Sequence, residues 1–318
     1  MSGHKRFTRF IIMLMQIVVS VCLLGWLILY TDLGDTKALV AATSAEIFIL
    51  CTAMLAVIVV PGAIRWRWFI LLFVTEVMPK PSLATVIRIN SVNVALNQFL
   101  PSTIGGDLYR VLVAKSLGLP FLKGVYATLA DRISALFFLL LFSAPAIVMI
   151  IVYGQITLPF SIHFIFAMCM AILCVFLICL YWFRRHSDSQ RTLSFVGIFF
   201  ASARTDGLVF HVILSSISIQ AITLFVMAII ARSVGIEIAL IPMVCILVIC
   251  LLASRLPISI SGWGVREGLS VSLFGLFGVA AESALVTSIL YGLTEVVAAL
   301  LALSVTYLTT SFKIRPLL

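Results

Sequence analysis

Two short stretches place glycines close to an arginine inside otherwise apolar sequence: NQFLPSTIGGDLYR at 97–110 and SRLPISISGWGVREG at 254–268. When Leu100 is set on Leu256, both read L-P-x-[ST]-I-[GS]-G-x-x-x-R, which ends at Arg110 and at Arg266. A guanidinium group binds phosphate through two parallel hydrogen bonds, and glycine lets backbone N–H groups approach the same anion. The repeated motif therefore predicts two matched sites for a phosphate-bearing group.

The polar residues in and around these motifs form two predicted sets. An ionisable side chain in an apolar membrane segment costs about 2.5–3.5 kcal/mol, so such residues are functional candidates by default. We expect the first set to bind an anionic head group and the second to couple or gate its movement. The first comprises Arg110, Arg266, Asp107, Glu267, Asn97, Gly105, Gly106, Gly262 and Gly264, and the second comprises Asp131, Arg132, Arg255 and Glu295.

A purely structural role is the competing interpretation for these charges. Under it they pair with one another: Asp107 with Arg110, and Glu267 with Arg266 or Arg255, while Asp131 and Arg132 are a solvated pair at the membrane edge. Glu295 has no charged neighbour in the sequence. It is either a proton-coupling group or a carboxyl neutralised by burial.

The sequence lacks the patterns of common enzymes and metal proteins. It contains no H-E-x-x-H, P-loop or G-x-G-x-x-G pattern and no serine-nucleophile context. Cys169, Cys174 and Cys179 are five residues apart, a spacing that spreads them around a helix instead of gathering them on one metal. We therefore expect no catalytic residues, no metal and no cofactor, and we expect that the protein is not an enzyme.

The composition places these candidates in a membrane. Of 318 residues, 63% are hydrophobic and 10% are charged, against about 45–50% and about 25% in soluble domains. Apolar runs long enough to cross a bilayer occur at 10–30, 46–64, 127–152, 159–183, 207–231 and 284–308. The predicted fold is an all-α, polytopic membrane helix bundle that forms one transmembrane domain, residues 1–318.

Two further apolar regions, 82–118 and 239–280, are interrupted by the repeated motif. Each is either a re-entrant hairpin, which gives six full spans, or a pair of crossings, which gives eight or more. The polar side chains of 82–100 favour re-entry, because irregular backbone in a bilayer must be buried in protein or line a wet cavity. Since each half holds one broken region, we predict an inverted-topology repeat of residues 10–152 and 159–308.

Basic residues lie mostly on one side of this arrangement. They precede the first span, follow the last, and recur in the flanks that begin at Arg65, Lys115 and Arg184. The positive-inside rule then places both termini in the cytoplasm. Topology thus accounts for the net charge of +9, and we expect no nucleic-acid partner.

Three motifs in order resemble the lysylphosphatidylglycerol synthase transmembrane-region family. They are N-x-F-L-P-x-x-x-G-G-D-x-x-R at 97–110, A-D-R-I-S at 130–134 and L-P-I-S-I-S-G-x-G-x-R-E-G at 256–268, and the resemblance extends from about Phe10 to Leu308. This family includes the flippase domain of bacterial multiple peptide resistance factor proteins. Here Tyr291-Gly292 stands where the family often has Tyr-Arg, and Ser261 where it often has glycine. No soluble aminoacyl-transferase domain accompanies the motifs, so we do not expect this chain itself to synthesise lysylphosphatidylglycerol.

The resemblance implies a lipid translocase of the bacterial inner (plasma) membrane. It would move an anionic or modified phospholipid, or a lipid-linked conjugate, between the two leaflets. The alternative is a membrane-embedded enzyme, or an accessory subunit of an aminoacyl- or glycosyl-transfer system, with Asp107, Asp131 or Glu267 as general base. A third interpretation is a scaffold for a separate synthase. The expected partners are therefore a membrane lipid, such a lipid-modifying synthase and, in a homo-oligomer, a second copy of the chain.

Overall fold

The computed structural model describes residues 43–74, 80–100, 104–153, 207–255 and 259–309, together with residues 18, 20–23, 25–27, 29 and 39. Every element formed within the five continuous ranges is a helix. The predicted span at 159–183, with its three cysteines, lies outside the described residues, as does most of the span at 10–30. Within the described part, the all-α prediction is confirmed.

Four of the predicted spans are confirmed as helices that are long and apolar enough to cross a bilayer. Helices α3 (Ala45–Val57) and α4 (Val59–Leu71) meet at Ile58 and together form the first. The others are α7 (Phe121–Tyr153), α10 (Leu208–Ser233) and α13 (Ala281–Thr309). The first of these helices continues seven residues beyond the predicted end at 64, to Leu71, so it contains Arg65 instead of ending before it.

Both predicted interruptions are present. Residues 82–118 form α5 (Leu83–Phe99) and α6 (Ile104–Ser116). Residues 239–280 form α11 (Leu240–Ser254), a single 3₁₀ turn η1 (Ile260–Gly262) and α12 (Val265–Gly275). Each first helix ends shortly before a proline, which lacks the N–H that a continuing helix needs and restricts the residue before it.

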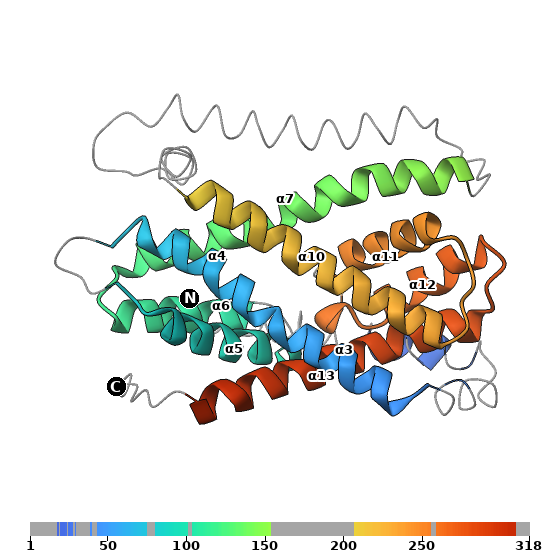
Figure 1. The fold of residues 1–318 in the computed structure, drawn as a ribbon, viewed down its shortest axis with the longest axis horizontal. Helices are drawn as coiled ribbons and strands as arrows, with labels where there is room; N and C mark the ends of the chain where they lie inside the picture. The colour runs from blue at the N-terminus through green and yellow to red at the C-terminus, as the bar shows by residue number, and fades with distance from the viewer. Residues whose placement is uncertain are drawn as a thin grey trace.

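The two broken regions pack in corresponding ways. Helix α5 contacts α6, and α11 contacts α12. Across the halves, α5 packs on α13 and α11 packs on α7. Figure 1 shows the α5–α6 pair at the left end of the long helices and the α11–α12 pair at the right end. The bundle thus holds one short helix pair near each end.

Candidate functional site

Four buried side chains from α4, α5, α6 and α7 meet inside the first half of the bundle: Arg65, Asn90, Arg110 and Asp131, here called the Arg110 cluster. The Asp131 carboxylate accepts from both arginines. Arg65 Nε lies 2.7 Å from Asp131 Oδ1, and Arg110 Nη1 lies 2.9 Å from Asp131 Oδ2. Arg110 Nη2 also donates to Asn90 Oδ1. One carboxylate therefore connects α4 and α6 to α7.

Because two arginines share one aspartate, the Arg110 cluster has a formal charge of +1. Arg65 Nη1 donates to Ser216 Oγ of α10 at 3.2 Å, and the Arg110 guanidinium carbon lies 5.2 Å from the centre of the Trp66 ring. Arg110 Nε is buried and has no hydrogen-bond partner among the described residues. A buried polar group left unpaired costs about 1–3 kcal/mol, so an incoming acceptor at this N–H would be stabilised.

A second and more exposed ion pair lies beside this cluster. Arg132 of α7 donates to both carboxylate oxygens of Asp107 of α6, through Nε and Nη2, each at 2.8 Å. The side chains are 33% and 20% exposed. This pairing replaces the Asp107–Arg110 pair considered from the sequence. Asp107 and Arg110 are three residues apart, hence on one face of α6, and each meets an opposite charge on α7.

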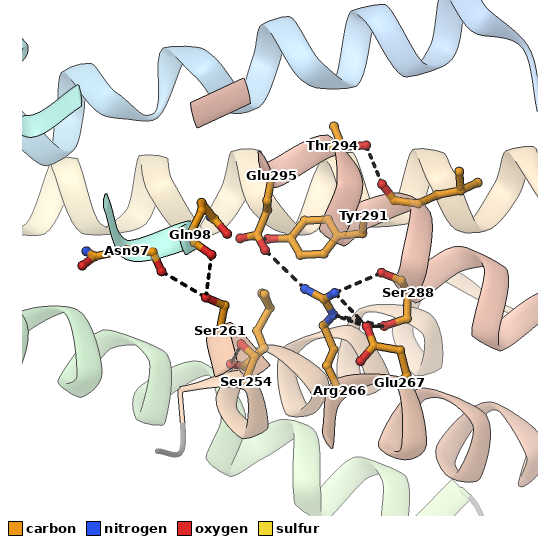
Figure 2. A network of polar contacts seen from close by, with 12 residues as sticks. Asn97, Gln98, Ser254, Ser261, Arg266, Glu267, Ser288, Tyr291, Thr294 and Glu295 are labelled. Atoms are coloured by element: carbon orange, nitrogen blue, oxygen red, sulfur yellow. Dashed lines mark hydrogen bonds and ion pairs between the residues drawn. The ribbon is translucent and has the colours of Figure 1, made fainter. Parts of the chain in front are cut away.

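The second cluster lies between α12 and α13 and comprises Arg266, Glu267, Ser288, Tyr291 and Glu295 (Figure 2). Within this Arg266 cluster, Glu267 Oε1 accepts from Arg266 Nη2 at 2.7 Å and from Nε at 3.1 Å. Ser288 Oγ accepts from Arg266 Nε and donates to Glu267 Oε1, both at 3.0 Å. Arg266 is 1% exposed and Glu267 is 0% exposed. These two residues thus form a fully buried, fully hydrogen-bonded ion pair.

Glu295 joins the Arg266 cluster although it is isolated in the sequence. Its Oε2 accepts from Arg266 Nη1 at 3.2 Å, and its Oε1 accepts from the Tyr291 hydroxyl at 2.8 Å. The Glu295 side chain is 24% exposed. Because one arginine faces two glutamates, this cluster has a formal charge of −1, opposite in sign to that of the Arg110 cluster.

Glycines determine how Arg266 is placed. Gly264 has a φ of +88°, a conformation that glycine adopts without steric cost, and its N–H donates to Glu267 Oε2 at 2.6 Å. This bond caps α12 and orients the Glu267 carboxylate. On α13, a Cβ atom at Gly292 would collide with the Arg266 guanidinium and lie 2.8 Å from the Trp263 ring. Arg266 can cross α13 only because position 292 has no side chain.

The two broken regions touch each other near their interruptions. Ser261 Oγ of η1 donates to the Asn97 carbonyl oxygen, near the end of α5, at 3.0 Å (Figure 2). In α6, the Gly106 N–H donates to Asn97 Oδ1 at 3.2 Å, and a Cβ at Gly106 would lie 2.5 Å from the same oxygen. The two copies of the motif, distant in the sequence, are therefore neighbours in the structure.

The predicted site residues fall into separate places. Arg110 and Asp131 lie in the Arg110 cluster with the Asp107–Arg132 pair beside it, Arg266, Glu267 and Glu295 form the second cluster, and Asn97, Gly105, Gly106, Gly262 and Gly264 lie near the interruptions. Arg255 ends α11 with an exposed side chain. The N–H groups of Gly106 and Gly264 already donate within the protein. A head-group role for these residues remains a prediction.

Sequence reasoning did not identify Arg65, Ser288 or Tyr291 as site residues. The charge count assigned Arg65 to a solvated cytoplasmic flank, whereas its side chain is buried on Asp131. The available signal was the run of apolar residues on both sides of Arg65, from Ala45 to Leu71. An arginine inside such a helix needs an acidic partner within the protein.

The acidic side chains of the site are held by arginines. The carboxylates of Asp107, Asp131 and Glu267 each accept hydrogen bonds from an arginine. In the part of the chain that the structure describes, no three histidine, cysteine, aspartate or glutamate side chains come close enough together to hold a metal ion.

Comparison with known proteins agrees with the motifs. Residues 13–302 match the family described as the lysylphosphatidylglycerol synthase TM region. A UPF0104 membrane protein of Methanothermobacter thermautotrophicus is 23% identical to this chain, in an alignment that covers 86% of each protein. Since the family match extends over most of the sequence, the chain belongs to the lysylphosphatidylglycerol synthase transmembrane-region family.

Proposed function

We propose that this protein is a lipid translocase, which moves an anionic or modified phospholipid, or a lipid-linked conjugate, between membrane leaflets. The observation that carries the proposal is the contact between the two interruptions, Ser261 with Asn97, with a buried charged cluster in each half of the bundle. Polar groups at this depth are costly and mark transport routes more often than plain scaffolding. A route for a lipid head group needs such groups across an otherwise apolar bundle.

The same proposal includes an inverted-topology repeat with re-entrant hairpins. In this repeat, α5 corresponds to α11 and α7 corresponds to α13. The packing is symmetric in the same way, because α5 packs on α13 and α11 packs on α7. The α5–α6 and α11–α12 pairs also lie at opposite ends of the long helices (Figure 1). Both features support hairpins that enter from opposite membrane faces. The distribution of basic residues supports termini in the cytoplasm, and we place the chain in a plasma membrane.

Within this proposal the two arginines have different roles. Arg110 belongs to a cluster with a surplus positive charge, and its buried Nε has no partner among the described residues. A phosphate would neutralise that charge and accept from that N–H. Arg266 belongs to a cluster with surplus negative charge. We therefore assign phosphate binding to Arg110 and a structural role to Arg266. Since Arg110 is 4% exposed, the helices around it must separate to admit the head group.

An enzymatic role receives less support from the site. Its three candidate general bases, Asp107, Asp131 and Glu267, already accept hydrogen bonds from guanidinium groups. Each of these three would have to give up a short hydrogen bond to an arginine before it could take a proton from a substrate. We therefore propose transport without a chemical change in the lipid.

The test uses two variants that change the charge of the Arg110 cluster equally. Arg110→Gln leaves the Arg65–Asp131 pair, and Arg65→Gln leaves the Arg110–Asp131 pair, so neither leaves Asp131 unpaired. In vesicles with acyl-labelled phosphatidylglycerol, Arg110→Gln should slow leaflet exchange by about tenfold or more, the loss expected for hydrogen bonds to a charged group. Arg65→Gln should slow it less. Equal rates for the two variants would contradict phosphate binding by Arg110, and no exchange of any lipid by the wild type would contradict a translocase.

A further inference from the structure

We propose that Glu295 is a proton-binding site that couples lipid movement to a transmembrane pH gradient; this inference rests on the proposed function and adds its energy source. The starting observation is the charge balance of the Arg266 cluster. Arg266 is already neutralised by Glu267, which receives four of the hydrogen bonds in the cluster. Glu295 is the second carboxylate on the same guanidinium.

The two glutamates differ in how firmly they are held. Glu267 is completely buried and lies 2.7 Å from Arg266 Nη2, and its second oxygen caps α12. Glu295 makes a longer contact of 3.2 Å with Arg266 Nη1 and keeps about a quarter of its side chain exposed. A proton arriving at this cluster would therefore bind Glu295, which leaves Arg266 and Glu267 as a neutral ion pair.

The surroundings of Glu295 suit a proton better than a metal cation. Among the described residues, the Tyr291 hydroxyl and an Arg266 N–H donate hydrogen bonds to its carboxylate. A hard cation needs several oxygen ligands that are free to coordinate it, and the two groups that contact this carboxylate are hydrogen-bond donors. Protonation only adds hydrogen to one carboxylate oxygen and changes the local charge from −1 to neutral.

Other polar and charged groups come from the elements packed around Glu295. Helix α5 packs against α13, which carries Glu295, and Ser261 of η1 donates to the backbone oxygens of Asn97 and Gln98 in α5 (Figure 2). Helix α12 contributes Arg266 and Glu267. From α11 come the buried Cys250 thiol, which interacts electrostatically with Arg266 and Glu267, and Arg255, which interacts with Tyr291. Glu295 thus lies close to the point where the two interruptions meet, and its charge can affect whether they separate.

The test uses Glu295→Gln, which has nearly the same shape and resembles the protonated state: its amide oxygen can still accept from Arg266, and its NH2 can donate to the Tyr291 hydroxyl oxygen. The matched control is Glu282→Gln, in the first turn of the same helix. Full-length protein is reconstituted in vesicles that contain acyl-labelled phosphatidylglycerol and an internal pH dye. We expect a pH gradient to bias lipid distribution and to drive proton movement with the wild type and with Glu282→Gln. Glu295→Gln should exchange lipid without responding to the gradient.

Different outcomes separate this inference from the proposed function. Wild-type exchange that ignores the gradient, or a response that Glu295→Gln retains, overturns proton coupling and leaves the translocase intact. No exchange under any gradient overturns both. Infrared difference spectra on acidification give a readout without transport: among the carboxylic-acid carbonyl bands of the protein, we expect one that Glu295→Gln removes and Glu282→Gln keeps. Spectra of Glu295→Gln that keep every band of the wild type contradict proton binding at Glu295.

Discussion

Asp131→Asn tests the Arg110 cluster most severely, because Asp131 is the only acidic side chain that pairs with Arg65 and Arg110 among the ion pairs of the described residues. The amide keeps the shape of the side chain but removes its charge, so the formal charge of the cluster rises from +1 to +2. Removing one partner of a buried ion pair costs about 3–5 kcal/mol. Asp131 and Arg110 are 3% and 4% exposed in their side chains, so water cannot compensate this loss. We expect the free energy of unfolding to fall by about that amount.

The assay is equilibrium unfolding of the purified protein in mixed micelles, with Asp107→Asn as the matched control. Asp107 makes the same kind of pair with Arg132, but both side chains are partly exposed, so its loss should cost about 1 kcal/mol or less. The double variant Asp131→Asn, Arg65→Gln returns the cluster to its original charge and should recover part of the stability. Equal destabilisation by Asp131→Asn and Asp107→Asn, or no recovery in the double variant, would refute the role given to Asp131.

Three further predictions concern the backbone around the two clusters. Gly106→Ala should destabilise the protein by about 1–3 kcal/mol, because the added Cβ has no room. Gly268→Ala, where the added Cβ meets open space, should be tolerated, and thermal unfolding of the two variants tests the difference. Ser261→Ala and Ser261→Gly lose the same hydroxyl. Because Ser261 has a φ of +49°, which glycine adopts more easily than alanine, the glycine variant should be more stable by about 1 kcal/mol. A reversed order in thermal unfolding would contradict this. Gly292→Ala should displace Arg266 and lower the unfolding temperature, and an unchanged temperature would contradict the close approach of these residues.

The helices and their interruptions could be predicted because their signals are local. An apolar run of sufficient length gives a span, and the prolines at 101 and 257 mark the ends of α5 and α11. The repeated motif also indicated which two regions correspond. The spans and their interruptions depend on residues that are close in the sequence, and the repeat is found by comparing two such short segments, so a single sequence contains these signals.

The partners of the charged residues could not be predicted in the same way. Asp131 pairs with Arg65 and Arg110 because α4, α6 and α7 converge, and helix packing at that level is not encoded in the spacing of any one segment. Their spacing correctly predicts that Asp107 and Arg110 lie on one face of α6. They pair with Arg132 and Asp131 of α7 instead of with each other. Glu295 was similarly isolated in sequence and paired only by the packing of α12 on α13.

The most direct test of the central claim is leaflet exchange by the wild-type protein in vesicles that contain acyl-labelled phosphatidylglycerol in both leaflets. A membrane-impermeant reductant added outside bleaches the outer-leaflet label at once and reaches the inner-leaflet label only as lipid crosses. A translocase predicts that vesicles with protein lose the label of both leaflets, while protein-free vesicles keep the inner one. Retention of the inner-leaflet label with the protein present, for phosphatidylglycerol and for aminoacylated and zwitterionic lipids alike, would contradict the account.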